Sequence, residues 1–328
     1  MPRRDFIAGL GSAVAWPIAA QAQQRALPVV GILSPTSASG AARLVSEIRA
    51  GLTATGYIEG SNVAIEHRYA DNQYDRLPAL AADLARRQVS VIVGYTGTAT
   101  LAAKAATPTI PIVFSLGGDP VQLGLVASFN RPGGNLTGVT FNSNELWGKR
   151  MQLMSELIPS ARIIAVLVNP RGAAAQRAVK DATDAAQALR QQVLVLQARD
   201  EQEIEFAFSR LVQQRADVLC ISNDPFRGDR TAQIVALARR YSVPANYPFP
   251  RQSIAGGLLS YGTSRANQDE LNRQVGTYVS RILKGEKPGD LPIMQPTRFE
   301  LVINLKAAKA IGLTIPEAFL QRADEVIE

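Results

Sequence analysis

The chain has 328 residues, about twice the length of a typical domain, so two domains are expected. Its composition, 46% hydrophobic and 19% charged with a net charge of +7, excludes disordered, collagen-like and coiled-coil chains, and the scattered basic residues argue against a nucleic-acid surface. The single cysteine and single histidine exclude an intramolecular disulfide framework and zinc sites built from several such residues.

The N-terminal segment has the pattern of an export signal. Two arginines, Arg3 and Arg4, precede an apolar stretch over 6–20, and Ala20-Gln21-Ala22 has the small residues of a cleavage site. The stretch is short for a bilayer span and contains a proline, so a permanent anchor is the weaker interpretation. The arginine pair leaves both the general secretory and the twin-arginine route open. We predict that residues 1–22 are a cleaved signal peptide.

Apolar runs alternate with helical patterns through the first half of the remaining chain. Residues 28–33 read as a buried parallel strand, and the next segment has Leu44, Val45 and Ile48 on one helical face before Gly56 ends it. The sequence predicts strands over 28–33, 62–69, 89–93, 110–114 and 136–139, and helices around 44–52, 77–84 and 98–106.

The alternation restarts near residue 146. Residues 165–170 repeat the pattern of residues 30–35, an apolar strand that ends in a small polar residue and a proline, as expected for two similar α/β lobes in tandem. The second half is predicted to contain helices over 146–158, 174–190, 202–214 and 231–241, and strands over 162–168, 193–197, 217–221, 243–246 and 257–260.

The tail departs from this alternation. A long helix over 268–283 is followed by a turn over 284–290, a strand over 299–303 and a short helix over 305–311. Since two complete lobes precede it, we expect this tail to cross back and tie the lobes together.

Ligands of parallel α/β sheets bind outside the carboxyl ends of the strands. The segment from Gly94 to Thr98 has glycines that allow close backbone approach, and two hydroxyls before a helix whose free N–H groups favour a carboxylate. The alternative is a plain helix cap by Thr96 or Thr98. Asp119 could meet a ligand amine, although Asp-Pro is also a routine turn.

The sequence gives little support for a catalytic function. His67 lies inside a predicted strand rather than at its end, and Cys220 ends an apolar strand where burial makes a thiol inert. No nucleophile elbow, phosphate loop or dinucleotide loop occurs after the signal segment. The rings of Tyr95, Tyr247 and Tyr261 could stack on a ligand or simply pack in the core or at its rim.

A set of short segments resembles the substrate-binding proteins of ABC transporters, in the branch that includes tryptophan- and tyrosine-binding members. The resemblance runs from about residue 27 to the C-terminus, and its segments are 56–60, 110–114, 118–121, 131–138, 165–170, 256–262 and 295–304.

The resemblance implies an α/β fold of two Rossmann-like lobes with parallel sheets, the type I periplasmic-binding-protein fold, with three crossovers and a hinged cleft. The N-terminal lobe would comprise residues 27–142 plus about 264–290. The C-terminal lobe would comprise residues 143–263 plus about 291–328.

The function implied is that of an extracytoplasmic receptor. It would bind a small polar ligand, amino-acid-like by preference, and deliver it to an ABC permease in the inner membrane. Neither catalysis nor a cofactor is implied, and a monomer is expected. No cysteine lies near the predicted cleavage site, so a free periplasmic protein rather than a lipoprotein is expected. The alternatives are a periplasmic sensor with the same fold and a secreted α/β enzyme.

By the same resemblance, the loop from Tyr95 to Ala99 would hold a ligand carboxylate, although members that bind amino acids often have Pro-Ala or Ala-Ala there. Asp119 and the pair Asn223-Asp224 would face an amine. The full set of candidate ligand-binding residues is Ser34, Thr36, Tyr95, Thr96, Gly97, Thr98, Ala99, Asp119, Pro120, Asn142, Asn169, Asn223, Asp224, Tyr247 and Tyr261.

Overall fold

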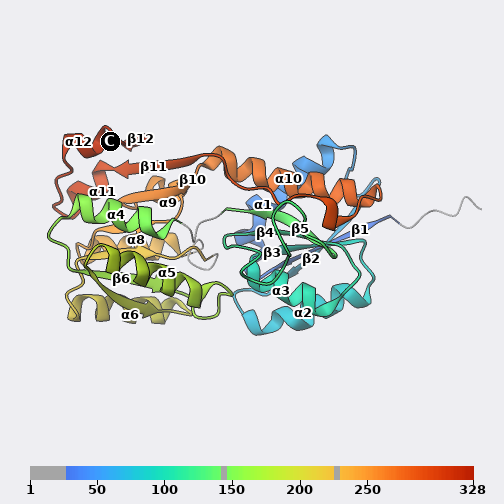
Figure 1. Cartoon of the computed structure of the whole chain (residues 1–328), viewed down its shortest axis with the longest axis horizontal. Helices are drawn as coiled ribbons and strands as arrows, with labels where there is room; N and C mark the ends of the chain where they lie inside the picture. The colour runs from blue at the N-terminus through green and yellow to red at the C-terminus, as the bar shows by residue number, and fades with distance from the viewer. Residues whose placement is uncertain (1–26, 142–145, 225–229) are drawn as a thin grey trace, which may run out of the picture.

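The computed structural model describes residues 27–141, 146–224 and 230–328. They form two α/β lobes side by side along the long axis of the molecule, each built on its own sheet (Figure 1). The expected fold class, two lobes with parallel sheets, is confirmed. The expected signal peptide lies outside the described residues.

The first lobe contains a five-stranded sheet in the order β2-β1-β3-β4-β5, and all its strand pairs are parallel. Helices α1 and α10 cover one face, and α2 and α3 the other. Its elements are β1 (Val29–Ser34), α1 (Ala38–Ala54), β2 (Ala64–Tyr69), η1 (Tyr74–Arg76), α2 (Leu77–Arg86), β3 (Val91–Tyr95), α3 (Gly97–Ala106), β4 (Ile112–Leu116), β5 (Leu136–Thr140), α10 (Arg265–Leu283) and η2 (Pro288–Asp290).

The second lobe contains a seven-stranded sheet in the order β12-β11-β10-β9-β8-β6-β7, in which only the β10–β11 pair is antiparallel among the described strands. Its elements are α4 (Trp147–Leu157), β6 (Ile163–Val168), α5 (Ala175–Ala188), β7 (Gln192–Gln197), α6 (Glu201–Gln213), β8 (Val218–Ile221), α8 (Thr231–Arg240), β9 (Ala245–Tyr247), α9 (Pro250–Ile254), β10 (Leu259–Thr263), β11 (Phe299–Asn304), α11 (Leu305–Ala310), α12 (Glu317–Leu320) and β12 (Glu325–Ile327).

The chain passes between the lobes at three places: after β5, after β10 and before β11. Adjacent crossings are hydrogen-bonded. The Thr263 hydroxyl donates to the carbonyl of Phe141 at 3.1 Å, and the N–H of Ser264 donates to the carbonyl of Arg298 at 3.1 Å. Helix α10 thus returns to the first lobe, where it packs against α1 although more than two hundred residues separate them (Figure 1).

The third crossing lies slightly later than the expected boundary at residue 291. Leu291 and Ile293 are buried in the two hydrophobic clusters of the first lobe. The N–H of Met294 donates to the carbonyl of Gly138 at 3.1 Å, which fixes this segment beside β5. The apolar side chains therefore keep residues 291–294 with the first lobe, and the chain crosses only after them.

The sheet of the second lobe is covered on both faces. One cluster lies under α4 and α5, and the other under α6 and α8. Cys220 is fully buried in the first of these clusters, and burial raises the pKa of its thiol to about 12, in keeping with the inert role expected. Within the described ranges, no helix combines the length and the apolar character needed to cross a membrane.

Candidate ligand site between the lobes

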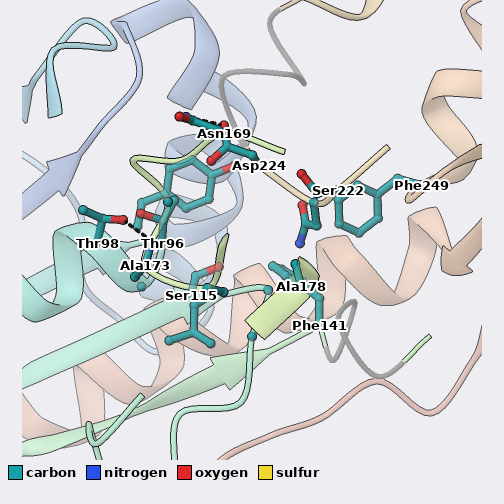
Figure 2. Close-up of a pocket in the computed structure, with 18 of the residues that line it drawn as sticks. Thr96, Thr98, Ser115, Phe141, Asn169, Ala173, Ala178, Ser222, Asp224 and Phe249 are labelled. Atoms are coloured by element: carbon teal, nitrogen blue, oxygen red, sulfur yellow. Dashed lines mark hydrogen bonds between the residues drawn. The ribbon is translucent and has the colours of Figure 1, made fainter. Parts of the chain in front are cut away.

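A cavity of about 110 Å³ lies between the lobes. Its walls come from the ends of β3 and β4 in the first lobe and from the loops after β6, β8 and β9 in the second. This is the position that parallel α/β sheets offer to ligands, because the strands end there and the following helices begin. Figure 2 shows polar side chains from both lobes converging on this space.

The first-lobe wall is the start of α3. Thr96 is its N-cap, and its hydroxyl accepts from the N–H of Ala99 at 3.5 Å. The Thr96 backbone has φ +83° and ψ 161°, a region that residues other than glycine rarely adopt and that costs about 1–3 kcal/mol. This conformation turns the chain sharply, so that the first-turn residues Gly97 and Thr98 line the cavity. Helix starts of this kind favour an anion.

The second-lobe wall carries a carboxylate. Asp224 follows β8 and lines the cavity, and its Oδ1 accepts from Nδ2 of Asn169 at 3.2 Å (Figure 2). Asn169, which follows β6, is almost fully buried. An amide that donates to the carboxylate fixes its orientation and leaves a charged acceptor at the cavity surface, suited to a ligand ammonium group.

The lobes touch directly across the cavity. The hydroxyl of Thr98 accepts from the N–H of Ala173 at 3.0 Å, as Figure 2 shows. The phenol of Tyr74 donates to both carboxylate oxygens of Asp224, at 3.4 and 3.3 Å. These contacts join η1 and α3 of the first lobe to the loops before α5 and after β8 in the second. Hydrogen bonds made by the protein itself therefore hold the two lobes together beside the cavity.

We expect Tyr74→Phe to shift the unliganded protein toward a more open arrangement, because the variant keeps the ring but loses the donor to Asp224. Small-angle scattering should then show a larger radius of gyration than for the native protein. Tyr261→Phe serves as the control, since Tyr261 packs in the second lobe away from the cavity. Equal radii for Tyr74→Phe and the native protein would show that this bond does not hold the lobes.

Two phenylalanines form another part of the wall. The rings of Phe141 and Phe249 meet edge to face, with centroids 6.3 Å apart and an interplanar angle of 86°. Both side chains are buried. Beside them, the Ser115 hydroxyl donates to Oδ1 of Asn272 at 3.1 Å. The cavity thus combines a polar region around Thr96 and Asp224 with an aromatic region.

The structure brings some of the predicted site residues to the cavity. The residues from the candidate set that line it are Tyr95, Thr96, Gly97, Thr98, Asn169, Asn223 and Asp224. Ser34, Thr36 and Ala99 do not. The hydroxyls of Ser34 and Thr36 bond to each other at 3.0 Å in the turn before α1, and Ala99 is buried in the first-lobe core. Asn142 lies outside the described residues.

Asp119 is placed by its own loop rather than by the cavity. Its Oδ1 accepts from the N–H groups of Val121 and Gln122, at 2.7 and 3.2 Å, and the residue faces an outer groove beside α5. The neighbouring Pro120 is buried and does not line the cavity. The Asp-Pro segment is thus a turn, the alternative that the sequence left open, and the expectation that Asp119 faces a ligand amine does not agree with this geometry.

Tyr247 and Tyr261 also lie away from the cavity. Tyr247 is fully buried in the cluster under α6 and α8, and burial raises the pKa of its phenol. Tyr261 stacks on Phe299, with ring centroids 6.3 Å apart, and packs against the other cluster of this lobe. Both rings therefore have the packing role that the sequence left as the alternative to ligand stacking.

Sequence reasoning missed a second group of lining residues. Arg43 and Asn272 come from the faces of α1 and α10, and nothing in their local pattern marks them as ligand-facing. Phe249 and Arg251 lie a few residues after the end of β9. The rule that ligands bind at the carboxyl ends of strands would have found them if it had been applied a few residues further along the chain. Phe141 directly follows β5 and could have been found by the same rule.

Comparison with known proteins agrees with this architecture. The family model of ABC transporter substrate binding proteins matches residues 4–327. A tyrosine-binding protein from Clostridioides difficile is 26% identical over 259 residues, which cover 79% of this chain and 73% of that protein. A conserved domain protein from Vibrio cholerae has a TM-score of 0.82 and 25% identity, covering 91% of this chain and 99% of that one.

A further solved structure, an ABC domain from Streptococcus pneumonia in complex with L-Trp, has a TM-score of 0.81 at 23% identity and covers 92% of this chain and 100% of that one. At this identity the likeness shows a shared fold. Because the family model spans nearly the whole length, the chain belongs to the family of ABC transporter substrate binding proteins.

Proposed function

We propose that this protein is a periplasmic receptor that binds an amino acid in the interlobe cavity and delivers it to an ABC permease in the inner membrane. It acts as a monomer, and it binds its ligand without chemical change. The ligand class is inferred from one observation. The start of α3 at Gly97 and Thr98, which favours an anion, and the carboxylate of Asp224 line the same cavity from opposite lobes. An α-carboxylate and an α-ammonium group satisfy both.

The relatives support the same ligand class. One curated relative is named a tyrosine-binding protein, and one structural neighbour was solved with L-Trp. Both ligands carry the zwitterionic head group that the two walls fit. A neutral sugar could donate hydroxyls to Asp224 but has no anion for the start of α3. An amino acid offers a charged group to each wall, and a hydrogen bond to a charged group contributes about 1.5–3 kcal/mol.

The test is a thermal-shift screen of the purified protein against each of the common L-amino acids, followed by calorimetric titration. A ligand that binds only the folded state must raise the Tm. For each amino acid that binds, the N-acetyl and the α-amide derivatives should bind much more weakly, because one removes the cation and the other the anion. Failure of every amino acid to shift the Tm would contradict the proposal. Bound ligand recovered unchanged after denaturation would support a receptor over an enzyme.

Export can be tested separately. We expect residues 1 to about 22 to be absent from the exported protein, because they have the charge, apolar stretch and small residues of a cleaved signal. Mass spectrometry of the periplasmic protein reads its N-terminus directly. An intact Met1 in that fraction would argue against cleavage. Replacing Arg3 and Arg4 by lysines should reduce export only if the twin-arginine route is used.

A further inference from the structure

The described residues that line the cavity include a cation in addition to the groups that fit a zwitterion. Of the described lining residues, three carry charge: Arg43, Asp224 and Arg251. Arg43 donates to both carboxylate oxygens of Asp269, at 2.8 and 2.6 Å, and this bond raises the pKa of its guanidinium. Its charge is thus matched within the first lobe. Asp224 accepts hydrogen bonds from Asn169 and Tyr74, so Arg251 is the described lining cation whose charge remains to be accounted for.

Arg251 has no carboxylate partner among residues 27–141, 146–224 and 230–328. Its side chain is exposed, and its guanidinium carbon lies 5.4 Å from the centroid of the Phe249 ring. Such stacking positions the group without neutralising its charge. If the α-carboxylate of a bound amino acid lies at the start of α3 and its ammonium group at Asp224, Arg251 still lacks an anion.

The position of Arg251 points to the side-chain end of the ligand. Figure 2 draws Thr96 and Thr98 on one side of the pocket, and Ser222 and Phe249 on the other. Since Arg251 stacks on Phe249, its cation stands at the aromatic side, away from the helix start that suits the α-carboxylate. A second carboxylate on the ligand side chain would extend toward it.

The size of the cavity favours a short side chain. Its volume of about 110 Å³ is well below the ~300–1,000 Å³ of pockets for drug-sized ligands. The hydrogen bonds between Thr98 and Ala173 and between Tyr74 and Asp224 limit its expansion while the lobes remain in contact. An indole or phenol side chain needs more room than a short carboxylate chain.

We propose that the cavity selects acidic amino acids, and that Arg251 is the specificity-determining residue that pairs with their side-chain carboxylate. This inference rests on the proposed function, because it takes the amino-acid head group to lie between α3 and Asp224. It adds the class of side chain and the residue that recognises it.

The test compares L-aspartate and L-glutamate with L-asparagine and L-glutamine, which have nearly the same shapes but no side-chain charge. Calorimetric titration of the purified protein should show the acids binding about tenfold more tightly than the amides, because a charge-assisted pair replaces a neutral contact. Arg251→Gln should remove this preference by weakening the binding of the acids about tenfold. Arg240→Gln is the matched control, since Arg240 also stacks on an aromatic ring but lies on α8 outside the cavity.

The outcomes separate this inference from the proposed function. If L-asparagine, L-tyrosine or L-tryptophan binds the native protein as tightly as the acids, or if Arg251→Gln keeps the preference, the acidic class is wrong and the amino-acid receptor stands. If another common L-amino acid binds and none of these does, the acidic class alone is wrong. If no common L-amino acid binds, the proposed function itself fails. Circular dichroism of each variant checks that the fold is retained.

Discussion

Asp224→Asn is expected to weaken the binding of an amino-acid ligand by about tenfold or more. The substitution keeps the shape of the side chain but removes the charge that faces the ligand ammonium group, and hydrogen bonds to charged groups contribute about 1.5–3 kcal/mol. Asn169 and Tyr74, which both donate to this carboxylate, would then face a neutral amide. Calorimetric titration with the amino acid found by thermal shift measures the loss.

Asp119→Asn provides the matched control. It makes the same chemical change at a carboxylate that accepts from the N–H groups of Val121 and Gln122 and does not line the cavity. We expect its affinity to stay within about twofold of the native value. If Asp119→Asn weakened binding and Asp224→Asn did not, the ligand amine would have to lie outside the interlobe cavity.

These two carboxylates show where sequence reasoning succeeds and where it stops. Both follow buried parallel strands, so the strand-end rule placed both near a ligand. The rule does not say whether a side chain faces the cleft or bonds to its own loop. At Asp119 the backbone N–H groups of Val121 and Gln122 donate to the carboxylate and hold it in its own loop. Aspartate side chains commonly make such local hydrogen bonds in turns.

The site residues contributed by α1 and α10 could not be predicted from the sequence for a different reason. Arg43, Gln268 and Asn272 project from the faces of α1 and α10, and these helices come together only because the chain crosses between the lobes three times. Helical spacing identifies which side of each helix is buried, and it was predicted correctly for Leu44, Val45 and Ile48. It carries no information on which neighbouring helix covers that side.

Short elements at the C-terminus were missed for lack of periodicity. Strand β12 has three residues, Glu325–Ile327, and it pairs with β11 in parallel at the edge of the sheet. Helix α12 spans only Glu317–Leu320. Neither is long enough to show a helical or alternating pattern, and both depend on packing against elements distant in the sequence.

The contact between α1 and α10 gives the largest expected effect on stability. A Cβ atom at Gly276 would lie 2.2 Å from the carbonyl oxygen of Ile48 and 2.9 Å from the amide nitrogen of Leu52. The facing Gly51 is equally close, since its own Cβ would lie 2.0 Å from the carbonyl oxygen of Arg273. The two backbones therefore meet at a pair of glycines, and a side chain at either one forces the helices apart.

We expect Gly276→Ala to lower the Tm by several degrees, because overpacking costs about 1–3 kcal/mol and each kcal/mol shifts the Tm of a protein of this size by about 2–4 °C. The higher helix propensity of alanine, about 1 kcal/mol, offsets only part of this. Gly148→Ala in α4 is the control, since its Cβ would meet nothing within 4 Å, and it should leave the Tm unchanged or raise it slightly. Equal melting temperatures for the two variants, measured by calorimetry, would show that α1 and α10 separate at little cost. A loss confined to Gly276→Ala would instead establish that this glycine contact holds α10, with the cavity residues Gln268 and Asn272, in place on the first lobe.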